Sequence, residues 1–294
     1  MRSRIAVSLA IGVASGLYCW ILLRHFHLGA ADFHSALDAA QDLLHGRNPY
    51  QRPLQLYPIT AALFALPLHR LSSDVAAGLF FGCSSAILAF GLTRQGYAQL
   101  LVFLVYPYWA ALLTAQWAPL IMASALFPIL LPATTAKPQL GLPVILTHPT
   151  RRGLAACVLW MALSFAWMPR WPVEWWRQLG SYQHFVPLLV WPGPLLLLAL
   201  FRYRRRSAWL MLLLSVTPQR WFYDSFVLWL IPKSRRSIVF TAAISWGAGI
   251  LRWYHMPSNF AQTARWADWF IYLPMLVAVL FGADEPATRG EAPA

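Results

Sequence analysis

Charged residues are scarce in this chain of 294 residues, and this scarcity is the first constraint on its fold. Asp, Glu, Lys and Arg make up 11% of the sequence, whereas soluble domains carry about 25%. Because a soluble protein of this length needs a charged and polar surface, the deficit excludes an ordinary soluble domain. It is also unlike intrinsic disorder, which combines low hydrophobicity with a high density of charge.

Cysteine is also rare. Cys19, Cys83 and Cys157 all lie in apolar segments, and no Cys-x-x-Cys or Cys/His spacing accompanies them. This pattern excludes a disulfide framework and a cysteine-based zinc site. We therefore expect all three to be buried as small apolar side chains.

Apolar residues are abundant, at 59% of the sequence with a mean hydropathy of +0.52. Long apolar runs separated by short polar segments are typical of a multi-pass membrane protein. We predict one all-α integral membrane domain of about 10–12 spans or half-spans over residues 1–282 and a disordered cytoplasmic tail over 283–294. Runs shorter than about 20 residues cannot cross alone, so the segments 139–149, 207–217 and 222–232 are expected to be broken or re-entrant helices.

Basic residues outnumber acidic ones by 23 to 10, a net charge of +13 that in a soluble protein would suggest nucleic acid. In a membrane protein the same excess follows from orientation, because cytoplasmic loops are enriched in Lys and Arg. Placing Arg2 and Arg4 in the cytoplasm puts the basic clusters at 151–152, 202–206 and 233–236 on the same side. We therefore predict a multi-pass protein of the cytoplasmic (inner) membrane, surrounded by lipid and without a nucleic-acid partner.

Two predicted outer segments stand out. Residues 170–184 are rich in Trp, which favours the headgroup level of a bilayer. Residues 24–56 form the longest polar connection, and from Asp32 onward their apolar residues recur at helical spacing, which predicts an amphipathic helix ending at Gly46. We expect this helix to lie along the membrane surface. Its apolar face is formed by Phe33, Leu37, Ala40 and Leu44.

Asp32 has two interpretations. An Asp just before an apolar periodic run is suited to cap the helix N-terminus. A carboxylate at a membrane-embedded cleft is also suited to accept a proton from an attacking hydroxyl. The other acidic residues of the helix, Asp38 and Asp42, are expected on a solvated face, and His34 and His45 repeat no known metal-ligand spacing, so no metal cofactor is expected.

Four short motifs follow one another through the first 232 residues. They are Asp32-Phe33 with Gly46-Arg47-Asn48-Pro49-Tyr50 and Leu56-Tyr57-Pro58; Ala115-Gln116-Trp117-Ala118-Pro119; Ala136-Lys137-Pro138-Gln139; and Ser215-Val216-Thr217-Pro218 with Trp221-Phe222-Tyr223-Asp224. In this order they resemble glycosyltransferase family 87, the polyprenyl-phosphate-mannose-dependent mannosyltransferase-like proteins of the GT-C class. The second motif departs from that family's Gly-Gln-x-Asn segment, since Ala115 replaces the Gly and Ala118-Pro119 replaces the Asn.

The resemblance implies a GT-C-like helical bundle and a membrane glycosyltransferase (hexosyltransferase) of the cell envelope. The implied reaction is an inverting transfer of a mannose-like hexose from a polyprenyl-phosphate donor to an acceptor hydroxyl of a glycan or glycolipid. It takes place on the outer face of the cytoplasmic membrane and needs no cofactor. Asp32 matches the family's first-loop acidic residue, which makes it the expected catalytic base.

Two basic residues are not required by topology. Lys137 is the only lysine in the first 232 residues and lies between apolar segments, where an ammonium is costly. Arg220 lies at the tip of the short hairpin 207–232, with Asp224 four residues further on. We expect Lys137 and Arg220 to bind the donor phosphate; the alternative is an ion pair between Arg220 and Asp224 that closes the hairpin.

Several polar and aromatic side chains are candidates for contacts with the sugar. The amides of Gln116 and Gln139 are suited to bind sugar hydroxyls, although hydrogen bonds between helices are an equal alternative. Tyr50 and Tyr57 are candidates for stacking on a sugar ring and belong to the motifs that carry the resemblance. The full candidate substrate-binding set is Asn48, Tyr50, Tyr57, Gln116, Gln139 and Asp224.

Two other functional classes share these features. A polytopic transporter or lipid flippase would also use broken helices and intramembrane Lys, Arg and Asp. The chain shows no pair of related halves, which transporters often have, and its polar outer loop fits an enzyme better. A catalytically inactive GT-C-like partner is the third class, because the C-terminal part is short for the family.

Overall fold

A computed structural model describes residues 1–28, 31–257 and 259–282, and these residues are almost entirely helical. They form no β-sheet, and a single isolated bridge pairs Phe185 with Gln219. The predicted all-α class is therefore confirmed. The predicted disordered tail, 283–294, lies outside the described residues.

Thirteen α-helices in the described residues alternate with short helices of other kinds. The α-helices are α1 (Arg2–Phe26), α2 (Ala31–Leu44), α3 (Ile59–Ala65), α4 (Ser73–Leu92), α5 (Tyr106–Leu112), α6 (Ala118–Ser124), α7 (Pro138–Thr147), α8 (Arg151–Trp167), α9 (Trp171–Gln178), α10 (Arg206–Val216), α11 (Arg235–Tyr254), α12 (Phe260–Ala267) and α13 (Leu273–Phe281). The 3₁₀-helices are η1 (Pro49–Gln51), η2 (Leu66–Leu68), η3 (Tyr97–Leu104), η4 (Pro128–Ala136), η5 (Leu179–Ser181), η6 (Pro187–Leu189), η7 (Gly193–Arg202) and η8 (Phe222–Leu230), and η9 (Asp268–Tyr272) is a π-helical turn.

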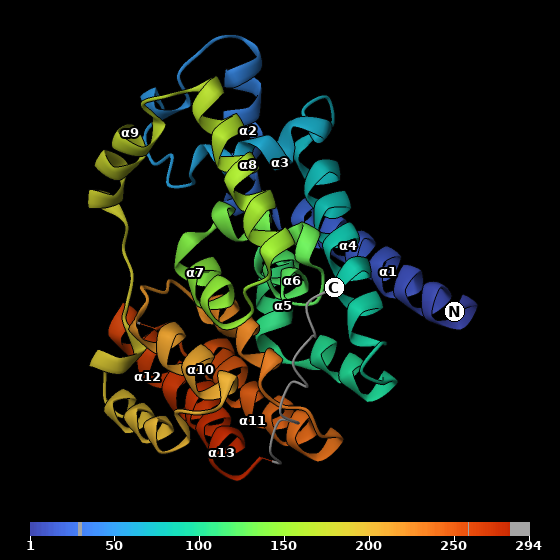
Figure 1. The fold of residues 1–294 in the computed structure, drawn as a ribbon, viewed down its shortest axis with the longest axis vertical. Helices are drawn as coiled ribbons and strands as arrows, with labels where there is room; N and C mark the ends of the chain where they lie inside the picture. The colour runs from blue at the N-terminus through green and yellow to red at the C-terminus, as the bar shows by residue number, and fades with distance from the viewer. Residues whose placement is uncertain (29–30, 258, 283–294) are drawn as a thin grey trace.

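The helices fall into two groups joined through a centre (Figure 1). Helices α2, α3, α8 and α9 lie in the upper part of this view, α5, α6 and α7 in the centre, and α10 to α13 in the lower part. The two long helices α1 and α4 lie together on one side. The segment that follows α9 runs down the opposite edge and connects the upper group with the lower one.

Helices long enough to span a membrane are present in the described residues, together with shorter apolar helices. Within the described residues, three helices are long and apolar enough to cross a membrane, Arg2–Phe26, Ser73–Leu92 and Phe260–Phe281. Helices α8 and α9 add a fourth if they count as one span, although they are bent by 90°. Four further apolar helices of 10–17 residues are too short to cross alone: Ile59–Leu68, Pro138–Thr147, Gly193–Arg202 and Arg206–Val216. The prediction of about 10–12 spans or half-spans is therefore confirmed only as far as a helical membrane protein with three or four candidate spans.

Proline explains much of this fragmentation. It fits the first turn of a helix but removes a backbone donor and clashes with the preceding turn elsewhere. Pro107, Pro119 and Pro138 each lie in the first turn of a short helix, so an apolar run that contains one of them restarts there. The segments predicted to be broken indeed form only the short helices α7, α10 and η8.

The burial pattern of helix α1 is the reverse of that in a soluble protein. Its small and polar residues Ser8, Gly12, Ser15 and Cys19 are buried, whereas its large apolar side chains point away from the protein. This arrangement is typical of membrane helices, in which small residues let two backbones approach and large ones contact lipid. The exposed side chains are Ile5, Leu9, Val13, Leu17 and Ile21.

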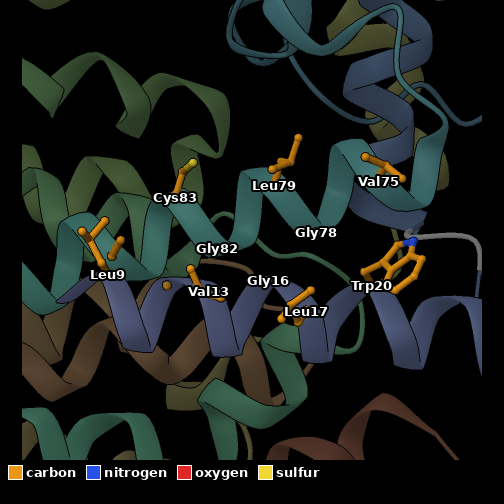
Figure 2. Close-up of a pocket in the computed structure, with 12 residues that line it drawn as sticks. Leu9, Val13, Gly16, Leu17, Trp20, Val75, Gly78, Leu79, Gly82 and Cys83 are labelled. Carbon is orange, nitrogen blue, oxygen red and sulfur yellow. The ribbon is translucent and has the colours of Figure 1, made fainter. Parts of the chain in front are cut away.

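Helices α1 and α4 cross through two Gly-x-x-x-Gly pairs, Gly12 with Gly16 and Gly78 with Gly82 (Figure 2). A Cβ on Gly16 would lie 2.8 Å from the Gly78 carbonyl oxygen, and one on Gly82 would lie 2.8 Å from that of Gly12. Contacts this short do not occur, so only glycine permits the crossing. The outward face is an apolar groove of about 410 Å³, and Cys83 beside it is exposed, which corrects the expectation that all three cysteines are buried.

The crossing yields a prediction about stability. Replacing Gly82 by Ala should destabilise the protein by about 1–3 kcal/mol, because the new methyl group meets backbone atoms that cannot rotate away. The measurement is thermal unfolding in detergent. Gly180→Ala is the matched control, since a Cβ at Gly180 meets nothing within 4 Å. Equal stability of the two variants would contradict the close packing.

Helix α2 is present as predicted, and most of its residues are buried by other parts of the chain. It ends at Leu44, just before Gly46, which has a positive φ of 66°. It packs against α3, α4, η1 and η2, and Asp42 is buried instead of solvated. The reason is that the following loop folds back over the helix, and its residues Arg47 and Arg52 both form ion pairs with Asp42.

Candidate functional site

A cavity of about 690 Å³ lies between the start of α2, the start of α7, helix α9 and the chain just before η8. Segments far apart in the sequence therefore meet around one space. The cavity lining includes five of the nine predicted site residues: Asp32, Tyr57, Lys137, Gln139 and Arg220.

Asp32 supplies the carboxylate of the cavity. It lies in the first turn of α2, where the positive end of the helix dipole favours a negative charge. It is 8% exposed, and its Oδ2 accepts a hydrogen bond from the side-chain amide of Gln116. Because Asp32 is the second residue of α2, it does not occupy the capping position before the helix, and its carboxylate is engaged by another segment of the chain.

Lys137 lies between η4 and α7 and is 4% exposed. Its Nζ lies 2.6 Å from Oδ1 of the fully buried Asp224 and donates to Oε1 of Gln116 at 2.8 Å. The ammonium also lies 4.8 Å from the centre of the Tyr223 ring. A buried carboxylate, an amide oxygen and an aromatic face thus replace the water that a lysine would otherwise bind.

The alternative considered for Arg220, an ion pair with Asp224, is not formed by their side chains. Its backbone N–H donates to Oδ2 of Asp224 at 2.9 Å, while Oδ1 of that carboxylate faces Lys137. The Nε of Arg220 is buried and has no hydrogen-bond partner among the described residues. Because the side chain lines the cavity, Arg220 places a positive charge beside the space that Asp32 also faces.

Asn48 and Tyr50 do not line the cavity, but they hold together the segments that line it. The Asn48 amide donates to Glu174 of α9, and the Tyr50 hydroxyl donates to the Tyr57 carbonyl at 3.2 Å. Helix α9 returns two bonds, because Trp175 Nε1 donates to the carbonyl of Leu56 at 2.8 Å and Gln178 Nε2 to that of Tyr50 at 2.9 Å. These contacts hold α9 against the first outer loop.

The sequence-based prediction missed the aromatic residues that α9 and the segment after it contribute to the cavity. Tyr182 and His184 line the cavity with their rings stacked at 5.6 Å, and the Tyr182 hydroxyl accepts a hydrogen bond from Gln139 at 3.3 Å. Trp175 and Trp176 also line it. The signal was a Trp-rich segment with Tyr and His at its end, which the belt interpretation assigned to the headgroup level.

The cavity tyrosines stay protonated. Burial, together with the negative charge of Asp32, raises the pKa of the Tyr57 hydroxyl far above its usual value. Burial also raises the pKa of Tyr182 and of Tyr223, and Asp32 and Asp224 add to both effects. These phenols can therefore donate hydrogen bonds at neutral pH. Asp32 is the one carboxylate among the residues that line the cavity, and His184 also lines it.

The acidic residues further along α2 have structural partners. Asp38 lies 3.2 Å from both His34 and Arg52, and Asp42 is paired with Arg52 and, at 2.8 Å, with Arg47. No group of three or more His, Cys, Asp or Glu side chains in the described part of the chain is arranged to hold a metal ion. Burial alone would raise the pKa of Asp42, but hydrogen bonds and charge from Arg52 and Arg47 outweigh it and lower that pKa.

Asp42 therefore links stability to pH. A carboxyl group whose pKa is lower in the folded state stabilises the protein above about pH 4 and ceases to do so as the pH falls through its folded value. We expect Asp42→Asn to cost about 1–3 kcal/mol at neutral pH, because two charge-assisted hydrogen bonds weaken. The cost should begin to shrink below about pH 4 and disappear once the pH is below the lowered pKa of the folded state.

Unfolding in detergent as a function of pH measures this difference. Asp38→Asn is the control, since Asp38 also faces Arg52 but its side chain is more exposed, at 24% against 4%. A loss for Asp42→Asn that is independent of pH, or no larger than that for Asp38→Asn, would contradict the role of the ion pairs.

Comparison of the chain with protein-family models, with curated proteins and with solved structures finds no match. The resemblance to glycosyltransferase family 87 thus depends on the short motifs alone. The chemistry of the cavity, and not a relative of known activity, is the basis for a functional proposal.

Proposed function

We propose that this protein is a membrane enzyme that transfers a hexose from a polyprenyl phosphate to an acceptor hydroxyl, with Asp32 as the general base. The observation that carries the proposal is the shared cavity of Asp32 and Arg220, in which a carboxylate and a cation face the same space. The reaction needs both groups. One accepts the proton of the attacking hydroxyl, and the other stabilises the departing phosphate.

The chemistry divides between these two side chains. The acceptor oxygen forms a bond to the anomeric carbon while the bond from that carbon to the phosphate oxygen breaks, and the phosphate leaves with the electron pair. Asp32 takes the hydroxyl proton. Attack opposite the phosphate inverts the anomeric centre. The Arg220 guanidinium, which can bind two phosphate oxygens at once, stabilises the negative charge on the leaving group.

The rim of the cavity suits a lipid-linked donor. Leu54 and Trp176 line it, and they are 62% and 72% exposed. Trp176 belongs to α9, which turns by 90° from α8, as expected of a helix at the membrane surface. A polyprenyl chain remaining in the bilayer can therefore place its phosphate and sugar in the cavity, beside Tyr57 and Tyr182, whose rings offer stacking and hydroxyl donors.

The proposed side of the membrane follows from helix α1. This helix carries the chain from the N-terminal arginines Arg2 and Arg4 to the start of α2, where Asp32 lies. If those arginines are cytoplasmic, as the positive-inside rule requires, Asp32 is outside. The proposed reaction accordingly takes place on the outer face of the cytoplasmic membrane, with a glycan or glycolipid of the envelope as acceptor.

The direct test replaces the proposed base. In membranes carrying Asp32→Asn, transfer from a radiolabelled polyprenyl-phosphate hexose to an envelope extract should fall about 10²–10⁴-fold, the usual contribution of general-base catalysis. Donors carrying mannose and glucose are both supplied. Asp38→Asn, six residues along the same helix but not lining the cavity, should retain wild-type transfer. Undiminished transfer by Asp32→Asn would remove Asp32 from the mechanism.

A second prediction concerns Arg220. Substitution by Gln keeps a polar side chain but removes the charge, so the KM for the donor should rise about tenfold or more. Arg220→Lys should recover part of the lost donor affinity, because the lysine ammonium keeps the positive charge but cannot bind two phosphate oxygens as the guanidinium does. Initial-rate kinetics with the donor varied provide the measurement. An unchanged KM in Arg220→Gln would show that this residue does not bind the phosphate.

A further inference from the structure

Four buried side chains form a continuous chain of contacts behind the cavity. Asp224 pairs with Lys137 at 2.6 Å, Lys137 donates to Gln116 at 2.8 Å, and Gln116 donates to Asp32. All four are at most 8% exposed. They come from η8, the start of α7, the segment before α6 and the start of α2, so the contacts join four separate parts of the chain.

Chemistry fixes which group donates and which accepts in each hydrogen bond of this row of four side chains. A lysine ammonium only donates, so the atom of Gln116 that faces it is the carbonyl Oε1. The other end of the same amide is then the NH₂ group, and it faces the Asp32 carboxylate, which accepts. An inverted amide would oppose two donors at one end and two acceptors at the other. Lys137 therefore determines which way the Gln116 amide points.

Lys137 is in turn held in place. Oδ1 of Asp224 faces the ammonium, and its Oδ2 is fixed by the backbone N–H of Arg220 at 2.9 Å. The Tyr223 ring covers the ammonium at 4.8 Å. With 4% of its surface exposed, Lys137 directs its charge into the protein, whereas the Arg220 side chain still has an unpartnered Nε.

We infer that Gln116 is a positioning residue for Asp32, and that Lys137 acts through this amide instead of binding the donor phosphate. The inference rests on the proposed function. Gln116 holds the Asp32 carboxylate by Oδ2, and this contact fixes how the carboxylate faces the cavity. The sequence-based assignment of Lys137 as a phosphate ligand is thus replaced, and Arg220 remains as the cation for that role.

Three variants isolate the amide. Gln116→Leu removes the donor to Asp32. The double variant Lys137→Met/Asp224→Asn removes both charges together, which avoids leaving one buried charge without its partner, and the Asn side-chain oxygen can still accept from the Arg220 backbone N–H. Gln99→Leu is the matched control, because Gln99 is a buried glutamine that donates to the Lys233 carbonyl instead. Gel filtration and thermal unfolding establish that each variant is folded.

The kinetic readout separates positioning from binding. Gln116→Leu and the double variant should lower kcat at least tenfold while the KM for the polyprenyl-phosphate hexose changes less than about twofold, because donor contacts are intact. Gln99→Leu should match the wild type. A double variant that is folded and instead raises the KM about tenfold with kcat unchanged would return Lys137 to the phosphate and overturn the inference.

A spectroscopic readout tests the same contact without any reaction. In purified protein carrying carboxyl-¹³C aspartate, the infrared carboxylate band of Asp32 is the one that Asp32→Asn removes. This band should shift in Gln116→Leu and in the double variant, and stay in place in Gln99→Leu. An unshifted band in folded Gln116→Leu would overturn the inference. Shifted bands in a protein that transfers no sugar would instead contradict only the proposed function.

Discussion

The buried charge of Lys137 is the constraint on which the rest of the site depends. An ammonium inside an apolar protein is tolerated only with a counter-charge and acceptors in good geometry, and removing one partner of such a pair typically costs about 3–5 kcal/mol. Asp224 supplies the charge, Gln116 the acceptor and Tyr223 the aromatic face. None of these three residues belongs to the same segment as Lys137, so the contacts of this one lysine join distant segments in the interior. The same contacts orient the Gln116 amide that binds Asp32.

The rest of the fold supports this arrangement from outside. Prolines divide several apolar runs into short helices, and Pro138 begins the one that follows Lys137. The start of α2, with Asp32, faces the same cavity as Lys137. Non-helical backbone at that depth is permitted because it is enclosed by protein or lines a cavity. Helices α1 and α4 form a rigid glycine-packed pair on one side, and α9 closes the cavity on another.

Features of the fold that follow from a single residue type, or from composition, could be predicted from the sequence. The apolar composition predicted membrane helices, Gly46 marked the end of α2, and the isolation of Lys137 in an apolar stretch marked it as a residue with a special partner. The partner itself could not be predicted. Spacing offered Arg220 as one possible partner of Asp224, but local periodicity carries no information on which distant segment approaches, and the carboxylate faces Lys137. Hydropathy also does not register where proline interrupts a helix, so it indicated the apolar segments but not the exact helices that they form.

The central claim is that this cavity transfers a sugar from a lipid phosphate. The most direct measurement is mass spectrometry of lipids and envelope glycans from cells with and without this protein. The account predicts that cells without it accumulate a polyprenyl-phosphate hexose and lose one hexose from an envelope glycan or glycolipid, and that restoring the protein reverses both changes. Identical lipid and glycan masses in the two kinds of cell would contradict it.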